Sequence, residues 1–272
     1  MVPMITRDPP TLRRPHLQQD NAIPYPVDVH GEAVLVVVAT YNEMDNVPDL
    51  VADIFAVLPA VNILVVDDHS PDGTGRWCEE HATLYPQLHC IQRSGKLGLG
   101  TAIVTGLKYA IAHGYDYVIN MDADYSHHPA YLPLLVANMN HHGLPRYDVL
   151  IGSRYVHGGN IHGWPLLRHV MSRGVNLYSR WLLCLTPRDC SGGYRCYRTS
   201  SLRHMPWGMI RSVGYAFQEE FLWHLHSTGA NIGEFPIVFV NRSLGQSKID
   251  LRESLSALTI IGRLGVQTWL GI

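Results

Sequence analysis

The sequence predicts an α/β protein with a doubly wound sheet, helices on both faces and a nucleotide-sized ligand at the carboxyl ends of the strands. Apolar, β-branched runs alternate with stretches of helical spacing, the order typical of βα units. Polar residues close two of these runs, with Tyr41–Glu43 after Glu32–Thr40, and Asp67 and Asp68 after Asn62–Val66. At 272 residues the chain is long enough to bury a large core.

In the first half of the chain, four predicted strands are each followed by a predicted helix. The strands are Glu32–Thr40, Asn62–Val66, Leu88–Gln92 and Tyr117–Met121. The helices are Asp45–Leu58, a segment from Thr74 toward His81, a segment through His113, and one from Pro129 to about His142. Proline and glycine in Ser70–Thr74 indicate a tight connection rather than a linker.

The second half contains three more predicted strands and two long helices. The strands are Asp148–Ser153, Tyr194–Tyr197 and Ile232–Val240, and the helices are Leu166–Leu185 and Tyr215–Gly229. A glycine-rich loop, 158–165, separates the first of these strands from the first of these helices. Pro236 removes a backbone donor, so we expect Ile232–Val240 to be an edge strand or to be bulged.

Two carboxylates follow the strand Tyr117–Met121. Asp122 and Asp124 are two residues apart, and on an extended segment such side chains point to the same side. Converging carboxylates repel one another unless a cation lies between them, and paired oxygen ligands suit Mg²⁺ or Mn²⁺, which would hold a diphosphate. The alternative for so short a pattern is a solvated acidic turn.

A second loop contains closely spaced glycines. Gly98 and Gly100 resemble the start of a dinucleotide fingerprint, but Ile103 stands where the third glycine would be. No GK[ST] follows either, so the loop is not a Walker loop. We interpret it as a close-packed start of a helix near a phosphate.

Composition excludes several classes of function. With 21 basic and 23 acidic residues, the chain has no charge excess that would favour nucleic-acid binding. The 16 histidines are scattered, and His127-His128 and His141-His142 lack the spacing of a zinc site, so they are predicted to be surface or turn histidines. The five cysteines form no CxxC pattern and indicate reduced thiols in a cytoplasmic protein.

We expect three segments along the chain. Residues 1–31 are proline-rich without a long apolar run and are predicted to be a mobile tail, not a signal peptide or an anchor. Residues 32–250 form the predicted catalytic domain. Residues 251–272 are too polar to span a membrane and are predicted to form an amphipathic helix that contacts a membrane or a partner.

Several motifs together resemble the dolichol-phosphate mannose synthases. They are ATYNE (39–43), VVDDHSPDGT (65–74), KLGLGTA (96–102), MDADYSHHP (121–129), GSRYVHGG (152–159), GW (163–164), SRG (172–174), SGGYRCYR (191–198), GYAFQEE (214–220) and RSLGQSK (242–248). Members of this family are inverting family-2 glycosyltransferases that transfer a sugar to a polyprenyl phosphate. The resemblance therefore implies a GT-A fold, a Rossmann-like doubly wound mixed sheet with helices on both faces.

The resemblance also implies roles for individual residues. Those expected to bind the donor nucleoside are Thr40, Tyr41, Glu43 and Asp68. Those expected to hold the metal and donor diphosphate are Asp122 and Asp124, with Gln218 near the sugar or metal and Arg242 and Lys248 at the leaving diphosphate. Those expected to receive the acceptor phosphate are Arg154, Arg168 and Ser172. The expected catalytic residues are Asp124, Gln218, Arg154 and Arg168.

The reaction implied is transfer of mannose from GDP-mannose to dolichyl or a related polyprenyl phosphate with inversion. A UDP-sugar transferase and a catalytically silent nucleotide-sugar-binding module are the alternatives. Ser126 stands where some members offer a glutamine, which leaves the third metal ligand open. Asp189 and Glu220 are candidates if a general base is used. The expected location is cytoplasmic, peripheral on the cytoplasmic face of a membrane, with a small membrane protein as a further candidate partner.

Overall fold

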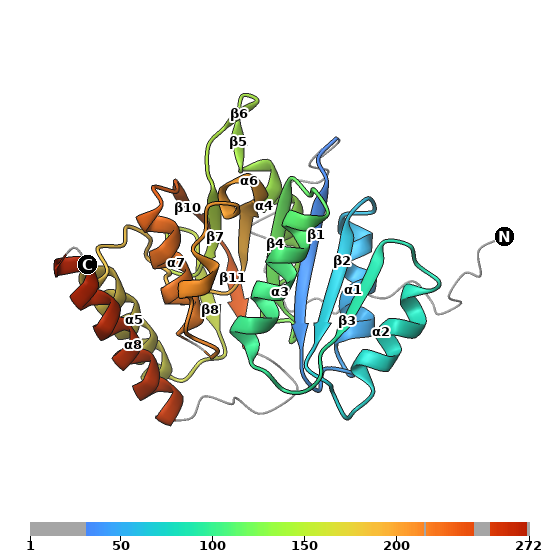
Figure 1. Ribbon diagram of the computed structural model, residues 1–272, viewed down its shortest axis with the longest axis horizontal. Helices are drawn as coiled ribbons and strands as arrows, with labels where there is room; N and C mark the ends of the chain where they lie inside the picture. The colour runs from blue at the N-terminus through green and yellow to red at the C-terminus, as the bar shows by residue number, and fades with distance from the viewer. Residues whose placement is uncertain (1–30, 215, 242–250, 271–272) are drawn as a thin grey trace.

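The computed structural model describes residues 31–214, 216–241 and 251–270, with the side chains of the last helix described from residue 257 onward. A seven-stranded sheet forms its centre, in the order β10-β7-β9-β4-β1-β2-β3, with helices on both faces (Figure 1). The strands are β1 (Val34–Thr40), β2 (Asn62–Asp67), β3 (Leu88–Gln92), β4 (Tyr117–Asp122), β7 (Val149–Ser153), β9 (Arg195–Arg198) and β10 (Ile232–Pro236).

The helices cover the sheet in two layers. They are α1 (Val47–Val57), α2 (Thr74–Ala82), α3 (Leu99–Ala112), α4 (Leu132–Ala137), α5 (Leu166–Leu182), α6 (Thr199–Leu202), α7 (Phe217–Ser227) and α8 (Leu251–Leu270), with 3₁₀ turns η1 (Pro129–Tyr131) and η2 (Trp207–Met209). Two short two-stranded ribbons pair β5 (Asn140–His141) with β6 (Leu144–Pro145), and β8 (Asn160–His162) with β11 (Val238–Val240).

Strand β9 makes the sheet mixed. It lies between β4 and β7 and is antiparallel to both, whereas β1, β2, β3 and β4 pair in parallel. The predicted doubly wound mixed sheet is therefore confirmed. The chain order reverses on the two sides of β1, which is the place where such sheets bind ligands.

Burial on both faces of β1 explains its continuous apolar run. Val36 and Val38 belong to the core under α1 and α4, while Leu35 and Val37 belong to the core under α3 and α7. Helix α3 lies very close to the sheet, because a β-carbon on Gly106 would be only 2.3 Å from Val37 Cγ1. Glycine is therefore required at this position for α3 and β1 to pack together.

Three predicted elements end elsewhere than expected. The helix predicted from Pro129 to His142 stops at Ala137, and β5 and β6 follow, joined by a turn in which His142 and Gly143 have φ of 49° and 75°. Two consecutive positive φ values are typical of a tight hairpin turn. The helix predicted to reach Leu185 ends at Leu182, and the last predicted strand is divided at Pro236 into β10 and β11, with β10 at the sheet edge as expected.

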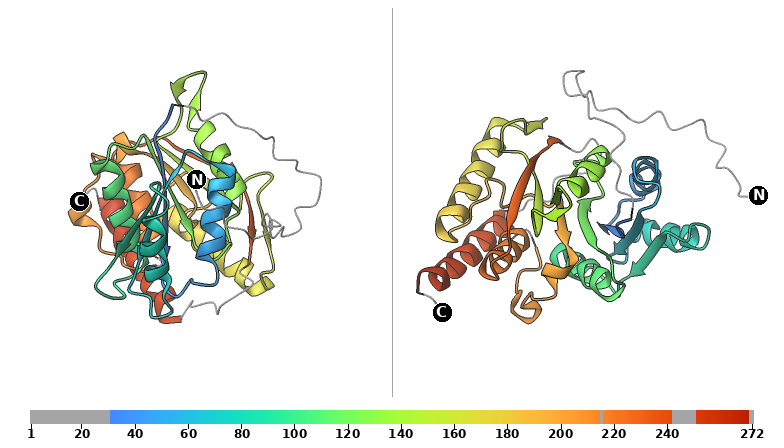
Figure 2. Two further views of the ribbon diagram at one scale, coloured as in Figure 1. Left: turned by 90° about the vertical axis from the view of Figure 1, so that its right-hand side faces the viewer. Right: turned by 90° about the horizontal axis from the view of Figure 1, so that it is seen from above.

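Helices α5 and α8 pack side by side at one end of the molecule (Figure 1 and the right view of Figure 2). A β-carbon on Gly265 of α8 would be 2.2 Å from Leu182 Cγ of α5, so the two helices are in close contact. The predicted C-terminal helix is thus present. Within the described residues, no helix combines the length and apolar character needed to cross a bilayer.

Candidate active site

The ends of five strands bring the expected site residues to one edge of the sheet, the lower edge in Figure 1. In the register of the sheet, Thr40 lies opposite Asp67, and Ala39 lies opposite Asp122. The end of β7 places Arg154 at the same edge, and the antiparallel β9 begins there after Gly193. Residues far apart in sequence therefore line one continuous edge.

On the β1 and β2 side, the expected nucleoside-binding residues hold the loops in place. Thr40 Oγ1 donates to Asp67 Oδ1 at 2.8 Å, and Lys96 Nζ lies 4.2 Å from the ring centre of Tyr41. The Glu43 amide donates to Thr74 Oγ1 at 3.1 Å, which joins β1 to the start of α2. These contacts orient Tyr41 and Glu43 at the edge, and their nucleoside contacts stay a prediction.

Asp68 organises the glycine loop. Its Oδ2 accepts the amides of Leu97 and Gly98 at 3.1 and 2.9 Å, and its Oδ1 forms an ion pair with Arg93 at 3.1 Å. The side chain is buried, so its carboxylate faces the protein rather than an open site. Its contribution to nucleoside binding would therefore act through the shape of this loop.

The two carboxylates of the DxD motif are arranged differently from the expectation of one extended segment. Strand β4 ends at Asp122, and Asp124 lies in the following turn, where Tyr125 has φ of 58°. Asp124 Oδ1 accepts the Ser126 amide at 3.0 Å, whereas the Asp122 side chain is 37% exposed at the edge. Because the chain turns immediately after Asp122, the two side chains do not follow the alternation of a strand.

Within the described ranges, no three side chains of histidine, cysteine, aspartate or glutamate are grouped closely enough to hold a metal ion. Two side chains near Asp122, those of His127 and Gln218, nevertheless carry buried polar atoms without hydrogen-bond partners, His127 Nδ1 and Gln218 Oε1. Carboxylate and amide oxygens suit Mg²⁺ or Mn²⁺, and imidazole nitrogen suits transition ions. The residue types at this edge therefore fit a divalent cation.

His127 lies in the turn after β4, one of the two environments that the sequence indicated, but it is buried rather than at the surface. It is 3% exposed, stacks on Tyr194 with ring centres 4.9 Å apart, and contacts the edge of Phe239. Burial lowers the pKa of His127 to about 4, against the opposing effect of Asp124. The neighbouring His128 is a turn histidine as expected, because its Nδ1 accepts the Ala130 amide at 3.1 Å.

Gln218 lies opposite Asp122. A β-carbon on Gly193 would be 3.2 Å from Gln218 Nε2 and 3.5 Å from Asp122 Oδ1, so the missing side chain leaves space between them. The backbone of Gln218 is held by Arg195, whose Nη1 donates to the Gln218 carbonyl at 2.9 Å. The start of α7 thus brings Gln218 near Asp122, and a contact of Gln218 with the sugar or a metal stays a prediction.

On the β7 side, Arg154 is clamped by a buried carboxylate. Asp189 accepts its Nε at 2.7 Å, its Nη2 at 2.6 Å and its backbone amide at 3.0 Å. Ser191 Oγ accepts a further bond from Nη2 at 2.9 Å. Burial alone would raise the pKa of Asp189, but the charge and hydrogen bonds of Arg154 lower it below its usual value.

Arg154 and Arg168 share one aromatic neighbour. The guanidinium carbons of Arg168 and Arg154 lie 4.2 and 5.5 Å from the ring centre of Trp164. Arg168 Nη1 donates to Asn241 Oδ1 at 3.1 Å, and Tyr155 Oη donates to Ser172 Oγ at 2.7 Å. The expected acceptor residues are therefore brought together, and Trp164 is an additional member that the sequence marked only as part of a GW motif.

The two candidate general bases are occupied by other contacts. Asp189 is 0% exposed and paired with Arg154, and Glu220 accepts the amides of Arg211 and Ser212, the latter at 2.7 Å. Neither carboxylate faces the edge as an accessible base. The remaining expected donor residues, Arg242 and Lys248, lie outside the described residues.

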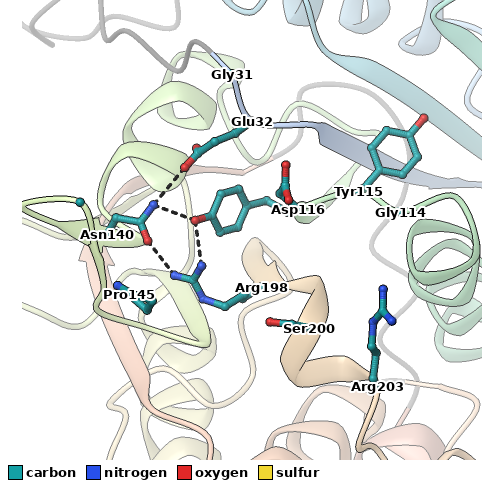
Figure 3. Close-up of a pocket in the computed structure, with 12 residues that line it drawn as sticks. Gly31, Glu32, Gly114, Tyr115, Asp116, Asn140, Pro145, Arg198, Ser200 and Arg203 are labelled. Atoms are coloured by element: carbon teal, nitrogen blue, oxygen red, sulfur yellow. Dashed lines mark hydrogen bonds between the residues drawn. The ribbon is translucent and has the colours of Figure 1, made fainter.

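A polar cavity of about 500 Å³ lies at the opposite edge of the sheet (Figure 3). Its wall contains a hydrogen-bonded network in which Asn140 Nδ2 donates to Glu32 and to Tyr117, and Arg198 Nη1 donates to the Tyr117 hydroxyl. Burial raises the pKa of Glu32. Since the network joins the β5–β6 ribbon to the sheet, we interpret it as structural.

Comparison with known proteins relates this chain to a family of enzymes. The model of Glycosyl transferase family 2 matches residues 35–205. The polyprenol monophosphomannose synthase of Mycolicibacterium smegmatis is 38% identical over 237 residues, 87% of this chain and 88% of that protein. The undecaprenyl-phosphate mannosyltransferase of Micrococcus luteus is 38% identical over 240 residues, 88% of this chain and 97% of that protein.

Solved structures agree with the architecture. Glucosyl-3-phosphoglycerate synthase from Mycobacterium tuberculosis, in complex with Mn²⁺, uridine diphosphate and glucosyl-3-phosphoglycerate, has a TM-score of 0.54 at 19% identity, covering 89% of this chain and 80% of that one. TarS 1–349 from S. aureus with UDP-GlcNAc has a TM-score of 0.54 at 18% identity, covering 85% of this chain and 66% of that one. At these identities the similarity supports the GT-A fold alone.

Proposed function

Because the chain belongs to glycosyl transferase family 2, we propose that it transfers mannose from GDP-mannose to a polyprenyl phosphate with inversion at the anomeric carbon. Two relatives at 38% identity, matched over almost the whole chain, are named for mannose transfer to polyprenyl phosphates. The observation that carries the proposal is one sheet edge that has Asp122 near Gln218 and Arg154 near Arg168; we assign the first pair to the donor and the two arginines to the acceptor.

The donor side would bind the nucleotide sugar. Thr40, Tyr41 and Glu43, at the end of β1, would contact the nucleoside, and Asp122 and Asp124 would hold Mg²⁺ or Mn²⁺. When bound, that cation supplies positive charge next to the leaving diphosphate. Arg242 and Lys248 are proposed to add to this charge, although they lie outside the described residues.

The acceptor side would position a phosphate monoester. Such a phosphate is largely ionised at neutral pH, with a second pKa of about 6, so it needs orientation more than deprotonation. Arg154 is held rigidly by Asp189, and Arg168 is supported by Trp164, which pre-organises two cations for the phosphate. With Asp189 and Glu220 occupied, we propose that no protein general base takes part, and that Ser172 helps to bind the phosphate.

The reaction is tested by transfer of radiolabel from GDP-mannose to polyprenyl phosphate in detergent, with Mg²⁺, Mn²⁺ or EDTA. We expect a lipid-extractable, cation-dependent product, and a loss of rate of about 10²–10³-fold in Asp122→Asn, the usual effect of removing one electrostatic contact. Asp116→Asn, at an exposed aspartate directly before β4 and so at the opposite edge of the sheet, is the matched control. Faster transfer from UDP-glucose than from GDP-mannose would show that the proposed donor is wrong. Absence of sugar transfer from every donor tried would refute an enzymatic role.

Peripheral membrane contact is proposed through α5 and α8. Large apolar side chains on these two helices are exposed, unlike most of the protein's apolar residues. They are Leu166, Leu167, Val170, Met171, Leu177, Trp181, Val266, Trp269 and Leu270. Trp181 and Trp269 lie with ring centres 6.4 Å apart, and α5 also carries Arg168, Arg173 and Arg180. Apolar and aromatic side chains beside arginines suit the interface of an anionic bilayer.

Sedimentation with liposomes tests this contact. Leu177→Glu with Trp181→Glu should abolish co-sedimentation with anionic liposomes, because both side chains are about two-thirds exposed and the change adds two negative charges. Leu84→Glu is the control, because Leu84 is exposed and lies just before β3, the edge strand at the opposite end of the sheet from β10. Equal binding of the wild type, the double variant and Leu84→Glu to the liposomes would show that α5 does not contact the membrane. We place the protein on the cytoplasmic face, in line with five free cysteines.

A further inference from the structure

We propose that His127 is the third protein ligand of the divalent cation, through Nδ1, and that this nitrogen makes the site prefer Mn²⁺ to Mg²⁺. The inference rests on the proposed function, because it assumes a cation at Asp122 and Asp124. It names a residue type and a metal preference that the motif alone left open.

The spacing of His127 and Asp122 is that of two ligands of one ion. His127 Nδ1 lies 3.6 Å from Asp122 Oδ2. With metal–ligand bonds of about 2.1–2.2 Å, two ligand atoms are about 3.0 Å apart at a right angle and about 3.6 Å apart when the angle opens to roughly 115°. A hydrogen bond between these atoms would need a shorter distance. The pair is thus too far apart for a hydrogen bond, yet correctly spaced for a shared cation.

The imidazole is oriented and has no other partner at Nδ1. The side chain is 3% exposed, and Nδ1 makes no hydrogen bond. Tyr194 stacks on one face of the ring with planes 19° apart, and Phe239 packs against it edge-on, so the ring is held in place. A buried polar atom without a partner costs about 1–3 kcal/mol, a cost that a bound cation would remove.

The neighbouring Ser126 is a poorer candidate. Its amide is bonded to Asp124 Oδ1 at 3.0 Å, and its short side chain is buried in the turn. The same turn directs His127 toward Asp122. Asp124 Oδ1 accepts the Ser126 amide, and Asp122, Asp124 and His127 are not grouped closely enough in the described structure to hold an ion, so cation binding would draw the three side chains closer together.

A nitrogen ligand changes which cation the site prefers. Mg²⁺ binds oxygen ligands almost entirely, whereas imidazole binds well to first-row transition ions. Two carboxylates and diphosphate oxygens accept either Mg²⁺ or Mn²⁺, but only Mn²⁺ gains from the His127 nitrogen. The expected preference is therefore for Mn²⁺.

The test is pulsed electron paramagnetic resonance of Mn²⁺ bound to the full chain with GDP, using protein labelled with ¹⁵N-histidine. We expect ¹⁵N coupling to Mn²⁺ in the wild type and its loss in His127→Phe, which keeps an aromatic ring, and in His127→Gln, which offers an oxygen. The Mn²⁺ dissociation constant should rise at least about tenfold in His127→Phe, the lower end of the loss seen when metal sites are perturbed. In His127→Gln the preference for Mn²⁺ over Mg²⁺ should fall. His141→Phe, at an exposed histidine, is the control.

Bound Mn²⁺ without ¹⁵N coupling in the wild type would overturn the inference, as would absence of Mn²⁺ binding with or without GDP. This readout needs no variant, so a misfolded variant cannot obscure it. Coupling without any sugar transfer would refute the proposed function and leave the ligand assignment standing. Sugar transfer without ¹⁵N coupling would refute the ligand assignment and leave the proposed function standing.

Discussion

Replacement of Asp189 by asparagine should destabilise the fold by about 3 kcal/mol. The carboxylate is 0% exposed and accepts three hydrogen bonds from Arg154, two from the guanidinium and one from the backbone amide. Removing one partner of a buried ion pair costs about 3–5 kcal/mol, mainly because the other charge remains buried. Asparagine keeps one acceptor oxygen, so we take the lower end of this range.

The loss is measured by urea unfolding of the full chain at pH 7, followed by circular dichroism. In thermal unfolding of the same proteins, this loss should lower the melting temperature by about 6–12 °C, at roughly 2–4 °C per kcal/mol. The pKa of Asp189 is lowered in the folded state, so its stabilising effect is present above the ordinary value of 3.8 and disappears as the pH falls through the lower folded-state value. The difference between wild type and variant should therefore shrink at pH 3.

Two controls make the result specific. Asp45→Asn, at an exposed site, should change stability by less than about 0.5 kcal/mol. The double variant Arg154→Met with Asp189→Asn should be less destabilised than the sum of the single variants, because no buried charge is left unpaired. A loss below about 1 kcal/mol in Asp189→Asn would show that the Arg154 charge finds another partner and would refute this reasoning.

Further predictions concern stability and acceptor binding. Burial raises the pKa of Glu219 to about 7, so wild-type stability should fall by roughly 3 kcal/mol between about pH 4.5 and 7, at about 1.36 kcal/mol per pH unit. A pH series of urea titrations should find this slope missing in Glu219→Gln, and an unchanged slope would exclude Glu219 as its source. Gly106→Ala should cost about 1–3 kcal/mol, since its β-carbon would meet Val37 Cγ1 at 2.3 Å; a melting temperature equal to that of wild type would mean that α3 moves freely. Trp164→Ala should raise the KM for polyprenyl phosphate by about 2–30-fold by removing the ring beside Arg168, and an equal rise in the KM for GDP-mannose would contradict an acceptor-side role.

The strands could be predicted from sequence because the apolar residues that make a strand buried are consecutive in the chain. The run around Val36 is apolar on both faces, and helices cover both faces of β1. The β5–β6 turn could not be predicted from an apolar pattern, because it depends on a positive φ at His142, which is not a glycine. The local signals of a turn were Gly143 next to it and Pro145 two residues later.

The site was only partly visible in the sequence for a similar reason. Asp122 and Arg154 follow apolar strands, so their position at the edge could be inferred from the strand pattern. The pairing of Arg154 with Asp189 spans 35 residues and depends on how β7 and the loop after α5 meet. Likewise, nothing near His127 indicates burial, because Phe239, which packs against it, comes from a distant strand.

Asn176 of α5 ties the loop behind Arg154 to the helix proposed to lie on the bilayer. Its Oδ1 accepts the amides of Cys190 and Ser191 at 2.7 and 3.2 Å, and Ser191 in turn bonds to Arg154. The helix and the arginine are therefore connected through Ser191. If α5 lies on a bilayer as proposed, this connection would fix the height of the acceptor phosphate above the membrane surface without contacting the prenyl chain, so we expect polyprenyl phosphates of different chain lengths to have equal KM values.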